Sequence, residues 1–290
     1  MSMLLIVADR EGERQVALSR GLELATKMGW GVQLVGFVYE NLDEAVKASG
    51  ADRQQLKKQL VGKRRAELEL ELEKHPSDVP VALTVVWEQT IHQWLDNQCE
   101  RKNYAAVIKT GHRSETFTYT STDWHLLREC PAPVLIAAEK KWRATKPIVA
   151  AIDLSDDSRG NKALNARIIE TAKEYAEKLD CKLYLVSALH IPRVLTELDL
   201  VDEHSHTKKL KSELTPKIAK LAREYDIPQS SFKLKQGPVD KVITSESARL
   251  KAQLVVMGTI GRQGVKGRLL GNTAEKVLNM LRTDVLALKP

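Results

Sequence analysis

A glycine-rich, basic segment at residues 258–277, GTIGRQGVKGRLLGNTAEKV, has the composition of an anion-binding loop. Glycine has no Cβ, so backbone N–H groups can turn toward a ligand and a phosphate group can approach the chain closely. Three basic side chains lie among the glycines: Arg262, Lys266 and Arg268. These residue types favour a loop that holds a phosphorylated ligand. The alternative is a surface turn whose glycines only cap the neighbouring elements.

The end of this segment predicts a helix that starts at the loop. Gly271 is followed by Asn272 and Thr273 and then by an amphipathic pattern, NTAEKVLNML. Asn and Thr are common helix N-caps, so we expect one of these two residues to cap the helix. The first turn of a helix offers unpaired N–H groups and the positive end of the helix dipole, which together form an anion site. Neither GxxxxGK[ST] nor GxGxxG after the first strand occurs, so the loop is neither of those common phosphate-binding loops.

The elements that would position this loop occur twice along the chain. Each half opens with an apolar run that ends in an aspartate, LLIVAD at 4–9 and IVAAID at 148–153, followed by an amphipathic helix and a second apolar run. Each half continues with a long polar helix, a third strand, a shorter helix, a fourth strand, a last helix and a fifth strand. The fourth strand of the second half, AQLVVMG, leads directly into the glycine segment.

Continuous apolar strands that alternate with helices are typical of a parallel sheet covered on both faces. Right-handed crossovers then predict an α/β fold with two tandem doubly wound (Rossmann-like) domains, each a five-stranded parallel sheet of order 3-2-1-4-5. We place the first domain at 1–139, a charged linker at 140–146 and the second domain at 147–290. The Leu/Glu alternation of AELELELEKH imitates a strand, but its helix-forming neighbours predict one helix over 52–74.

Composition excludes several classes of protein. The content of 43% hydrophobic and 29% charged residues indicates a soluble globular chain, and no apolar run approaches the roughly 18 residues of a membrane span. The start has no signal-peptide pattern, and three widely spaced cysteines support neither a disulfide framework nor a zinc site, so we expect a cytoplasmic protein. Residues 1–145 carry 20 Lys+Arg and 20 Asp+Glu, whereas 146–290 carry 25 and 18. This basic half lacks a nucleic-acid-binding signature, so specific nucleic-acid binding is not expected.

The sequence resembles the universal stress protein family at several motifs. Gly258-x-x-Gly261, nine more residues and then Gly271 resemble that family's ATP-binding signature, G-x2-G-x9-G-[ST]. AIDLSDDS (151–158) resembles its first-strand motif, and QGPVDKVI (236–243) its Gly-Pro turn. The likeness covers both halves in the order that the family requires. The tandem arrangement and TSTDWHLLRECPAPV (120–134) are similar to tandem-domain, E-type members.

The resemblance implies roles for individual residues in the second half. Asp153 would meet the adenosine end of a nucleotide, while Ala188 and Met257 would offer backbone groups to the adenine. Ribose and phosphates would be surrounded by Gly258, Gly261, Arg262, Gly271, Asn272 and Thr273. The family has Ser or Thr after the last glycine, where this chain has Asn272 with the hydroxyl one place later. The implied ligand is ATP or another adenine nucleotide, with Mg²⁺ as its companion ion.

The first half lacks these glycines. Aligning AVIKTGHRSETFTYTSTDWHLL on VVMGTIGRQGVKGRLLGNTAEKVL places Lys109, His112 and Thr120 at the three key glycines. Side chains there would enter space that phosphates need, so we expect the first half not to bind ATP in the family manner.

Two weaker patterns carry no predicted chemistry. We interpret His204 and His206 as part of a solvated loop between helices rather than as metal ligands. Asp123 and His125 are two apart on a predicted helix and face different ways, so they do not form an acid–base pair. No catalytic residue and no metal site are therefore predicted.

The leading hypothesis is a cytoplasmic stress-response protein whose second domain binds an adenine nucleotide and acts as a ligand-gated regulator or protective factor. One alternative is an interaction scaffold that binds an apolar ligand or a protein partner and keeps a vestigial loop. A weak ATPase is the most that the sequence allows as an enzyme. The resemblance also implies an intramolecular pseudo-dimer of the two domains across their fifth strands, with a homodimer of chains and an unidentified protein partner as further options.

Overall fold

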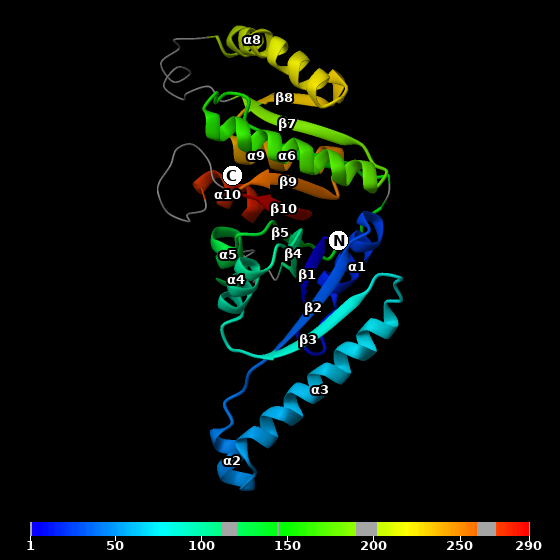
Figure 1. The fold of residues 1–290 in the computed structure, drawn as a ribbon. Coiled ribbons are helices and arrows are strands. Elements are labelled where there is room, and N and C mark those ends of the chain that lie inside the picture. Colours follow the sequence, from blue (N-terminus) through cyan, green and yellow to red (C-terminus); the bar gives the residue numbers. More distant parts are fainter. Residues whose placement is uncertain (1, 112–120, 144, 190–201, 260–270, 290) are drawn as a thin grey trace. The chain divides into compact units, whose positions relative to one another are not determined.

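A computed structural model describes residues 2–111, 121–143, 145–189, 202–259 and 271–289 of the 290-residue chain. The chain divides into two compact units, Met1–Lys141 and Trp142–Pro290 (Figure 1). The side chains of 121, 203 and 204 are outside the description. Among the described residues, no helix has the length and apolar character that crossing a membrane requires.

The first unit alternates strands and helices along its length, as the sequence predicts. The elements are β1 (Met3–Val7), α1 (Val16–Met28), β2 (Gly31–Val38), α2 (Asp43–Ser49), α3 (Arg53–Lys74), β3 (Val81–Trp87), α4 (Ile91–Arg101), β4 (Ala106–Thr110), α5 (Ser121–Glu129) and β5 (Val134–Ala137). The single helix expected over 52–74 is confirmed. It begins after Asp52, whose carboxylate accepts a hydrogen bond from the N–H of Gln55 at 2.9 Å.

The second unit repeats this order. Its elements are β6 (Ile148–Ala151), α6 (Arg159–Lys178), β7 (Leu183–Leu189), α8 (Glu203–Glu224), a 3₁₀ turn η1 (Gln229–Ser231), β8 (Phe232–Gln236), α9 (Val239–Leu250), β9 (Leu254–Gly258), α10 (Asn272–Met280) and β10 (Asp284–Leu288). The prediction of a loop around His204 and His206 is wrong. Asp202 caps α8 by accepting from the N–H of Ser205 at 2.7 Å, so both histidines lie in the first turn of that helix.

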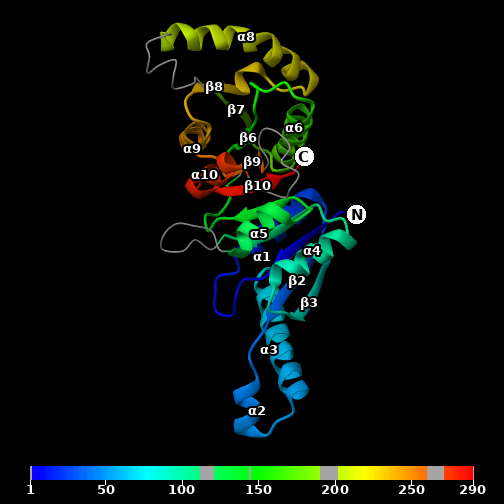
Figure 2. The ribbon, with the colours of Figure 1, turned by 90° about the vertical axis from the view of Figure 1, so that its left-hand side faces the viewer.

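Within each unit the five strands run parallel to one another, and both units have the predicted strand order. The first unit has the order β3-β2-β1-β4-β5 and the second the order β8-β7-β6-β9-β10. Helices α6 and α9 lie on opposite faces of the second sheet, with α10 beside α9 (Figure 2). The α/β, doubly wound fold class is therefore confirmed. The expected pairing of the two fifth strands stays a prediction.

The central strands are buried because both faces of each sheet are covered. All five residues of β4 are buried, β1 is buried from Leu4 to Val7, and β9 is buried from Leu254 to Met257. This burial explains why these strands are continuous apolar runs rather than alternating ones. Lys109 of β4 is a charged residue within these strands, and its side chain is only 9% exposed.

Lys109 is stabilised by a buried carboxylate on α5. Its Nζ lies 2.7 Å from Oδ1 of Asp123, a residue that is 0% exposed, and also donates to the backbone oxygen of Thr110 at 3.1 Å. Asp123 lies in the first turn of α5, as expected. His125, two residues further on, instead meets Asp96 of α4 at 2.8 Å, so the expectation that the two side chains face different ways is confirmed.

The variant Lys109→Met should lower the free energy of unfolding of the first unit by about 3–5 kcal/mol, because the buried Asp123 carboxylate would lose the charge of Lys109. The double variant Lys109→Met/Asp123→Leu should regain most of that loss. Urea unfolding followed by tryptophan fluorescence measures this unit, because it holds four of the five tryptophans: Trp30, Trp87, Trp94 and Trp124. A double variant no more stable than Lys109→Met would contradict the ion-pair account.

Two histidine side chains lie together between α4 and α5 of the first unit. The rings of His92 and His125 lie 3.9 Å apart between centroids. Burial, and next the charge of His125, lower the pKa of His92, while Asp96 opposes the shift. The unfolded chain therefore takes up a proton at His92 more readily than the folded chain does.

The urea midpoint of the first unit should consequently fall as the pH drops through about 6.5, the ordinary pKa of histidine, toward the lower pKa of the folded state. His92→Gln should flatten this part of the pH profile. His75, which follows α3 and takes no part in the pair, supplies the control variant His75→Gln. A wild-type profile that does not differ from the His92→Gln profile would refute this assignment.

Candidate functional site

The second unit has a cavity at the carboxyl ends of β6, β7 and β9. Its volume is about 570 Å³, within the usual range for small-molecule sites. The chain winds from β6 outward to β7 and β8, and then returns to the other side of β6 to form β9 and β10. The cavity thus lies at the point where the winding reverses, which is where open parallel sheets bind ligands.

Seven of the nine residues named from the sequence line this one cavity. They are Asp153, Ala188, Met257, Gly258, Gly271, Asn272 and Thr273. They come from four separate parts of the chain: the end of β6, the end of β7, the end of β9 and the start of α10. Gly261 and Arg262, together with Lys266 and Arg268, lie outside the described residues. That the seven hold a ligand remains a prediction, but the fold does bring them together.

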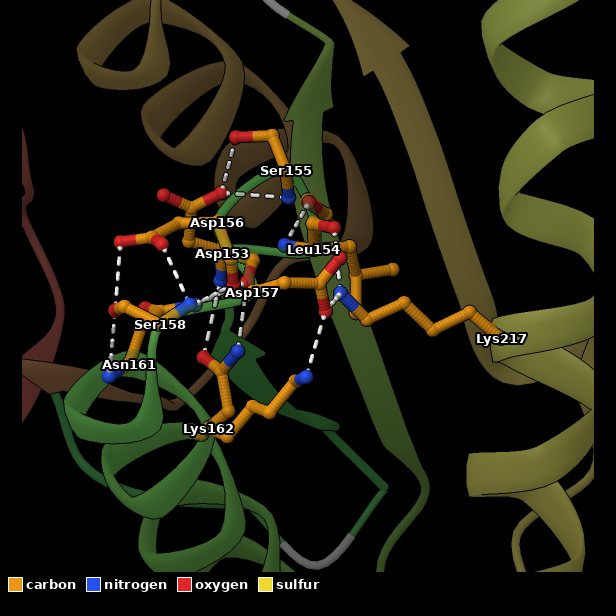
Figure 3. Close-up of polar contacts among 11 residues, drawn as sticks. Asp153, Leu154, Ser155, Asp156, Asp157, Ser158, Asn161, Lys162 and Lys217 are labelled. Atoms are coloured by element: carbon orange, nitrogen blue, oxygen red, sulfur yellow. Dashed lines mark hydrogen bonds and ion pairs between the residues drawn. The ribbon is translucent and has the colours of Figure 1, made fainter.

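Asp153 is held at the cavity by a turn that the sequence only partly indicated (Figure 3). Its Oδ1 accepts from the N–H and the hydroxyl of Ser155 at 2.9 and 2.6 Å. The side chain of Asn165, on α6, accepts from the Asp153 N–H at 3.1 Å and donates to its carbonyl at 2.6 Å. Asn161 donates to the same carbonyl at 2.8 Å. This clamp fixes the backbone at Asp153 while the carboxylate stays at the cavity wall.

The same turn is tied to α8 by charge. Nζ of Lys217 donates to the carbonyl of Leu154 at 2.8 Å and to the carboxylate of Asp157 at 2.9 Å. Lys162, from α6, lies 3.1 Å from the same carboxylate (Figure 3). The hydrogen bonds from Lys217 and then Lys162 lower the pKa of Asp157. The turn is therefore held by Lys162 of α6 and Lys217 of α8. Lys217 is 60 or more positions away from its two partners in the sequence.

Gly258 is required by close packing at the cavity wall. A Cβ at this position would lie 2.6 Å from Cδ2 of Leu164, a residue that also lines the cavity. Any side chain would have to displace Leu164. Glycine at the end of β9 is thus favoured by the packing of Leu164 as well as by the loop that follows.

Helix α10 begins at the cavity with a cap that has no side chain. The N-cap is Gly271, and Asn272 is the first helical residue, so the expectation that Asn272 or Thr273 caps the helix is wrong. The N–H of Glu275 donates to the carbonyl of Gly271 at 3.0 Å and starts the helical ladder. Since glycine cannot accept from the first-turn amides, those of Asn272, Thr273 and Ala274 face a position suited to an anion.

The sequence missed several residues of the cavity. Apolar side chains form much of its lining: Ile152, Leu164, Ile168, Val239, Ile243 and Val277. Lys276 of α10 and Asp240 of α9 also line it, as do Asn161 and Asn165. The apolar positions could be predicted only as core, because nothing in their spacing shows that a cavity interrupts the packing. The two asparagines lie at i and i+4 on α6, a spacing that could have marked them as a pair on one face.

The strand registers correct the alignment of the two halves. Leu4 pairs with Ala106 in the first unit, and Ile148 pairs with Leu254 in the second. Leu4 and Ile148 are equivalent, because each lies five residues before the aspartate that follows its strand. Counting onward from these pairs, Thr110 matches Gly258, and Lys109 matches Met257. The expectation that Lys109 takes the place of Gly258 is therefore wrong by one residue. The continuous apolar strands gave the sequence alignment no fixed point for the register.

Thr110 lies in the first unit where Gly258 lies in the second, and its side chain binds the first-strand aspartate. Its hydroxyl donates to the carboxylate of Asp9 at 2.8 Å and accepts from the N–H of Ala17 at 2.9 Å. Asp9 is only 4% exposed, and Arg64 of α3 donates to its carbonyl. The first-strand aspartate of this unit is thus bound by protein groups. His112 and Thr120, the other two aligned positions, lie outside the described residues.

Comparisons with known proteins agree with this architecture. The model of the universal stress protein family matches residues 144–289, half of the chain. The chain is 26% identical over 295 residues to Universal stress protein E of Escherichia coli K12, covering 99% of this chain and 93% of that protein. A homologue of that protein in Haemophilus influenzae is 26% identical over 299 residues, with coverages of 99% and 97%.

Solved structures share the fold over nearly the whole chain. A functionally unknown protein from Pseudomonas aeruginosa PAO1 superposes with a TM-score of 0.75 at 24% identity, covering 99% of this chain and 92% of that one. A universal stress protein from Archaeoglobus fulgidus gives 0.61 at 14% identity, with coverages of 99% and 98%. With the family pattern over its second half and tandem relatives aligned along 99% of its length, the chain belongs to the universal stress protein family.

Proposed function

We propose that the second unit binds one molecule of ATP or another adenine nucleotide and that the chain acts in the cytoplasm as a nucleotide-gated regulator or protective factor in the stress response. The observation that carries this proposal is the convergence of seven motif residues on a single cavity at the reversal point of the sheet. The family to which the chain belongs supports the stress-response role.

The lining of the cavity suits the two ends of a nucleotide. Its apolar walls, which include Ile152, Ile168 and Ile243, offer a flat base the apolar contact that it needs. Ala188, at the end of β7, and Met257, on β9, bring backbone groups to the same wall. Asp153, clamped at the rim, is a carboxylate acceptor suited to the hydroxyl groups of a ribose.

The phosphate end fits the start of α10. The N-cap Gly271 has no side chain to accept from the first-turn amides, and Asn272 and Thr273 are exposed at the cavity. Lys276 adds a positive charge one turn further along. The helix dipole and these donors together would stabilise a polyphosphate. Gly261 and Arg262 belong to the same proposal on the grounds of the sequence motif alone, and a Mg²⁺ ion would accompany the phosphates.

The first unit is proposed not to bind nucleotide. Thr110 supplies a side chain where Gly258 has none, and it binds the aspartate that a ribose would otherwise meet. The buried pair of Lys109 and Asp123 lies directly beside it. A nucleotide could enter here only if the hydrogen bonds of Thr110 to Asp9 and Ala17 were broken and the Lys109–Asp123 ion pair moved.

Two other functions compete with this proposal. An apolar ligand or protein partner could use the apolar walls, whereas an ATPase would need a general base. One oxygen of the Asp153 carboxylate already accepts two hydrogen bonds from Ser155 and is engaged in positioning the turn. Mass spectrometry of ligand released from the purified protein distinguishes the proposed functions. A bound nucleotide would support the proposal, and a bound lipid would support the interaction scaffold.

Titration with ATP should saturate at about one nucleotide per chain. Gly258→Thr, which copies Thr110 of the first unit, should weaken binding about tenfold or more, because the new side chain displaces Leu164 into the cavity. Gly62→Thr is the matched control, since a Cβ on Gly62 of α3 meets no atom within 4 Å. Isothermal titration calorimetry gives both quantities. Two equal sites per chain, or equal affinity in Gly258→Thr and Gly62→Thr, would refute the assignment.

ATP should bind more tightly than adenosine, because the start of α10 and Lys276 favour anions. The difference in affinity should shrink as salt rises from about 0.05 to 0.5 M, where charges are screened over a few ångströms. Lys276→Gln should weaken ATP binding more than adenosine binding. Equal affinities for the two ligands, unchanged by salt, would show that this helix end does not hold phosphates.

A further inference from the structure

Two cysteine side chains meet between α4 and α5 of the first unit. Cys99 lies in the last turn of α4, and Cys130 directly follows α5. Their Sγ atoms are 3.8 Å apart, with the Cys130 thiol donating to the Cys99 sulfur. Neither residue is part of a disulfide. They are 31 positions apart in the sequence, so only the fold makes them neighbours.

The surrounding contacts hold these sulfurs close to each other. One turn before Cys99, Asp96 accepts from His125 of α5 at 2.8 Å, and His92 stacks on the His125 ring. His92, Asp96 and Cys99 thus follow one face of α4, at the spacing that sets side chains in a row along a helix. The N–H of Cys130 donates to the carbonyl of Leu126 at 3.1 Å, which continues the α5 ladder to the cysteine. Both backbones are therefore held at the contact.

A disulfide at this position needs only a local shift. The S–S bond is about 2.05 Å long, so the sulfurs must approach by less than the width of one atom. Both cysteines lie at helix ends. A small backbone adjustment is easier at a helix end than at a helix centre. A rotation about the side-chain bonds of Cys99, which is only partly buried, supplies part of the approach.

We propose that Cys99 and Cys130 form a redox-modification site that a peroxide converts reversibly from dithiol to disulfide. In the first step the Cys99 thiolate attacks one oxygen of hydrogen peroxide. The O–O bond breaks, Cys99 becomes a sulfenic acid, and the other oxygen leaves as hydroxide, which takes up the proton that the Cys99 thiol lost and becomes water. In the second step the Cys130 sulfur attacks the Cys99 sulfur, the S–O bond breaks, and the hydroxide that leaves takes up the Cys130 proton to give a second water. Two electrons pass from the two sulfurs to the peroxide.

The burial of the two residues sets the order of these steps. Cys130 is 0% exposed, while Cys99 is half-buried, so peroxide reaches Cys99 first and Cys130 resolves the sulfenic acid from inside. The thiol hydrogen bond from Cys130 stabilises negative charge on the Cys99 sulfur, the reactive form. A sulfenic acid beside a second thiol condenses with it to a disulfide, which a reducing dithiol can open again.

Cys181 of the second unit provides an internal comparison. It follows α6 and is also half-buried, and burial raises the pKa of its thiol. It lies in a different unit from the other two cysteines. The proposed chemistry therefore predicts loss of two thiols out of three, with Cys181 left over.

The test oxidises the full-length, reduced protein with hydrogen peroxide and then alkylates it with N-ethylmaleimide in denaturant. Wild-type protein should carry one maleimide instead of three, and trypsin should release peptides 75–101 and 129–140 joined to each other. Dithiothreitol before alkylation should restore three. Cys181→Ser should keep the link, whereas Cys99→Ala and Cys130→Ala should each lose it.

Urea unfolding gives a second readout that does not depend on the peptides. The cross-link constrains the unfolded chain, so oxidation should raise the midpoint of the first unit in wild type and in Cys181→Ser, but not in Cys99→Ala. Retention of three alkylatable thiols would overturn the proposal. So would a sulfinic acid on Cys99 with Cys130 still alkylatable, or a disulfide that joins two chains or includes Cys181.

Discussion

A carboxylate at the carboxyl end of the first strand has to be surrounded by donors, because burying a charge without partners costs several kcal/mol of free energy. Both units have this aspartate, buried as Asp9 in the first and partly buried as Asp153 in the second, and different groups surround it. In the first unit Asp9 takes the hydroxyl of Thr110 and is closed over. In the second unit, two asparagines of α6 and Ser155 fix the backbone and one oxygen of Asp153 at the wall of a cavity. The proposal that only the second unit binds nucleotide rests on that difference.

The packing around the two aspartates extends the contrast. Gly258 lets Leu164 lie against β9 and keeps the cavity open. At the matching position the side chain of Thr110 points to Asp9, and the neighbouring Lys109 pairs with Asp123 of α5. The charged contacts of the first unit thus hold its helices to its sheet. The charged contacts of Lys217 in the second unit hold a turn at the rim of a site.

The sequence predicted the elements well because their signals are local. Apolar runs gave the strands, and helix-forming residues after Asp52 outweighed the alternation of Leu and Glu in α3. The strand order followed from the general handedness of crossovers. The predicted strand order also placed Asp153 and Gly258 near each other, because each lies at the carboxyl end of a strand and these two strands are neighbours in one parallel sheet.

Errors arose where single residues or distant contacts decide the outcome. The match of Lys109 with Gly258 failed by one position, because only strand pairing fixes a register within continuous apolar runs. The cap of α10 is Gly271 rather than a polar residue, a choice that depends on the path of the preceding chain. The contact between Cys99 and Cys130 spans 31 positions and depends on how α4 packs against α5. None of these can be read from local propensity.

The hydrogen bonds of Thr110 make a change to glycine at this position of the first unit costly. Replacing Thr110 by glycine alone would remove a donor from a buried carboxylate, at a cost of about 1–3 kcal/mol, without moving Lys109 or Asp123. Several substitutions would have to occur together before a ligand could repay that cost. Such dependence among neighbouring residues is epistasis, and it acts as a ratchet. A unit whose side chains depend on one another in this way can keep drifting in sequence, but the route back to glycine passes through less stable intermediates.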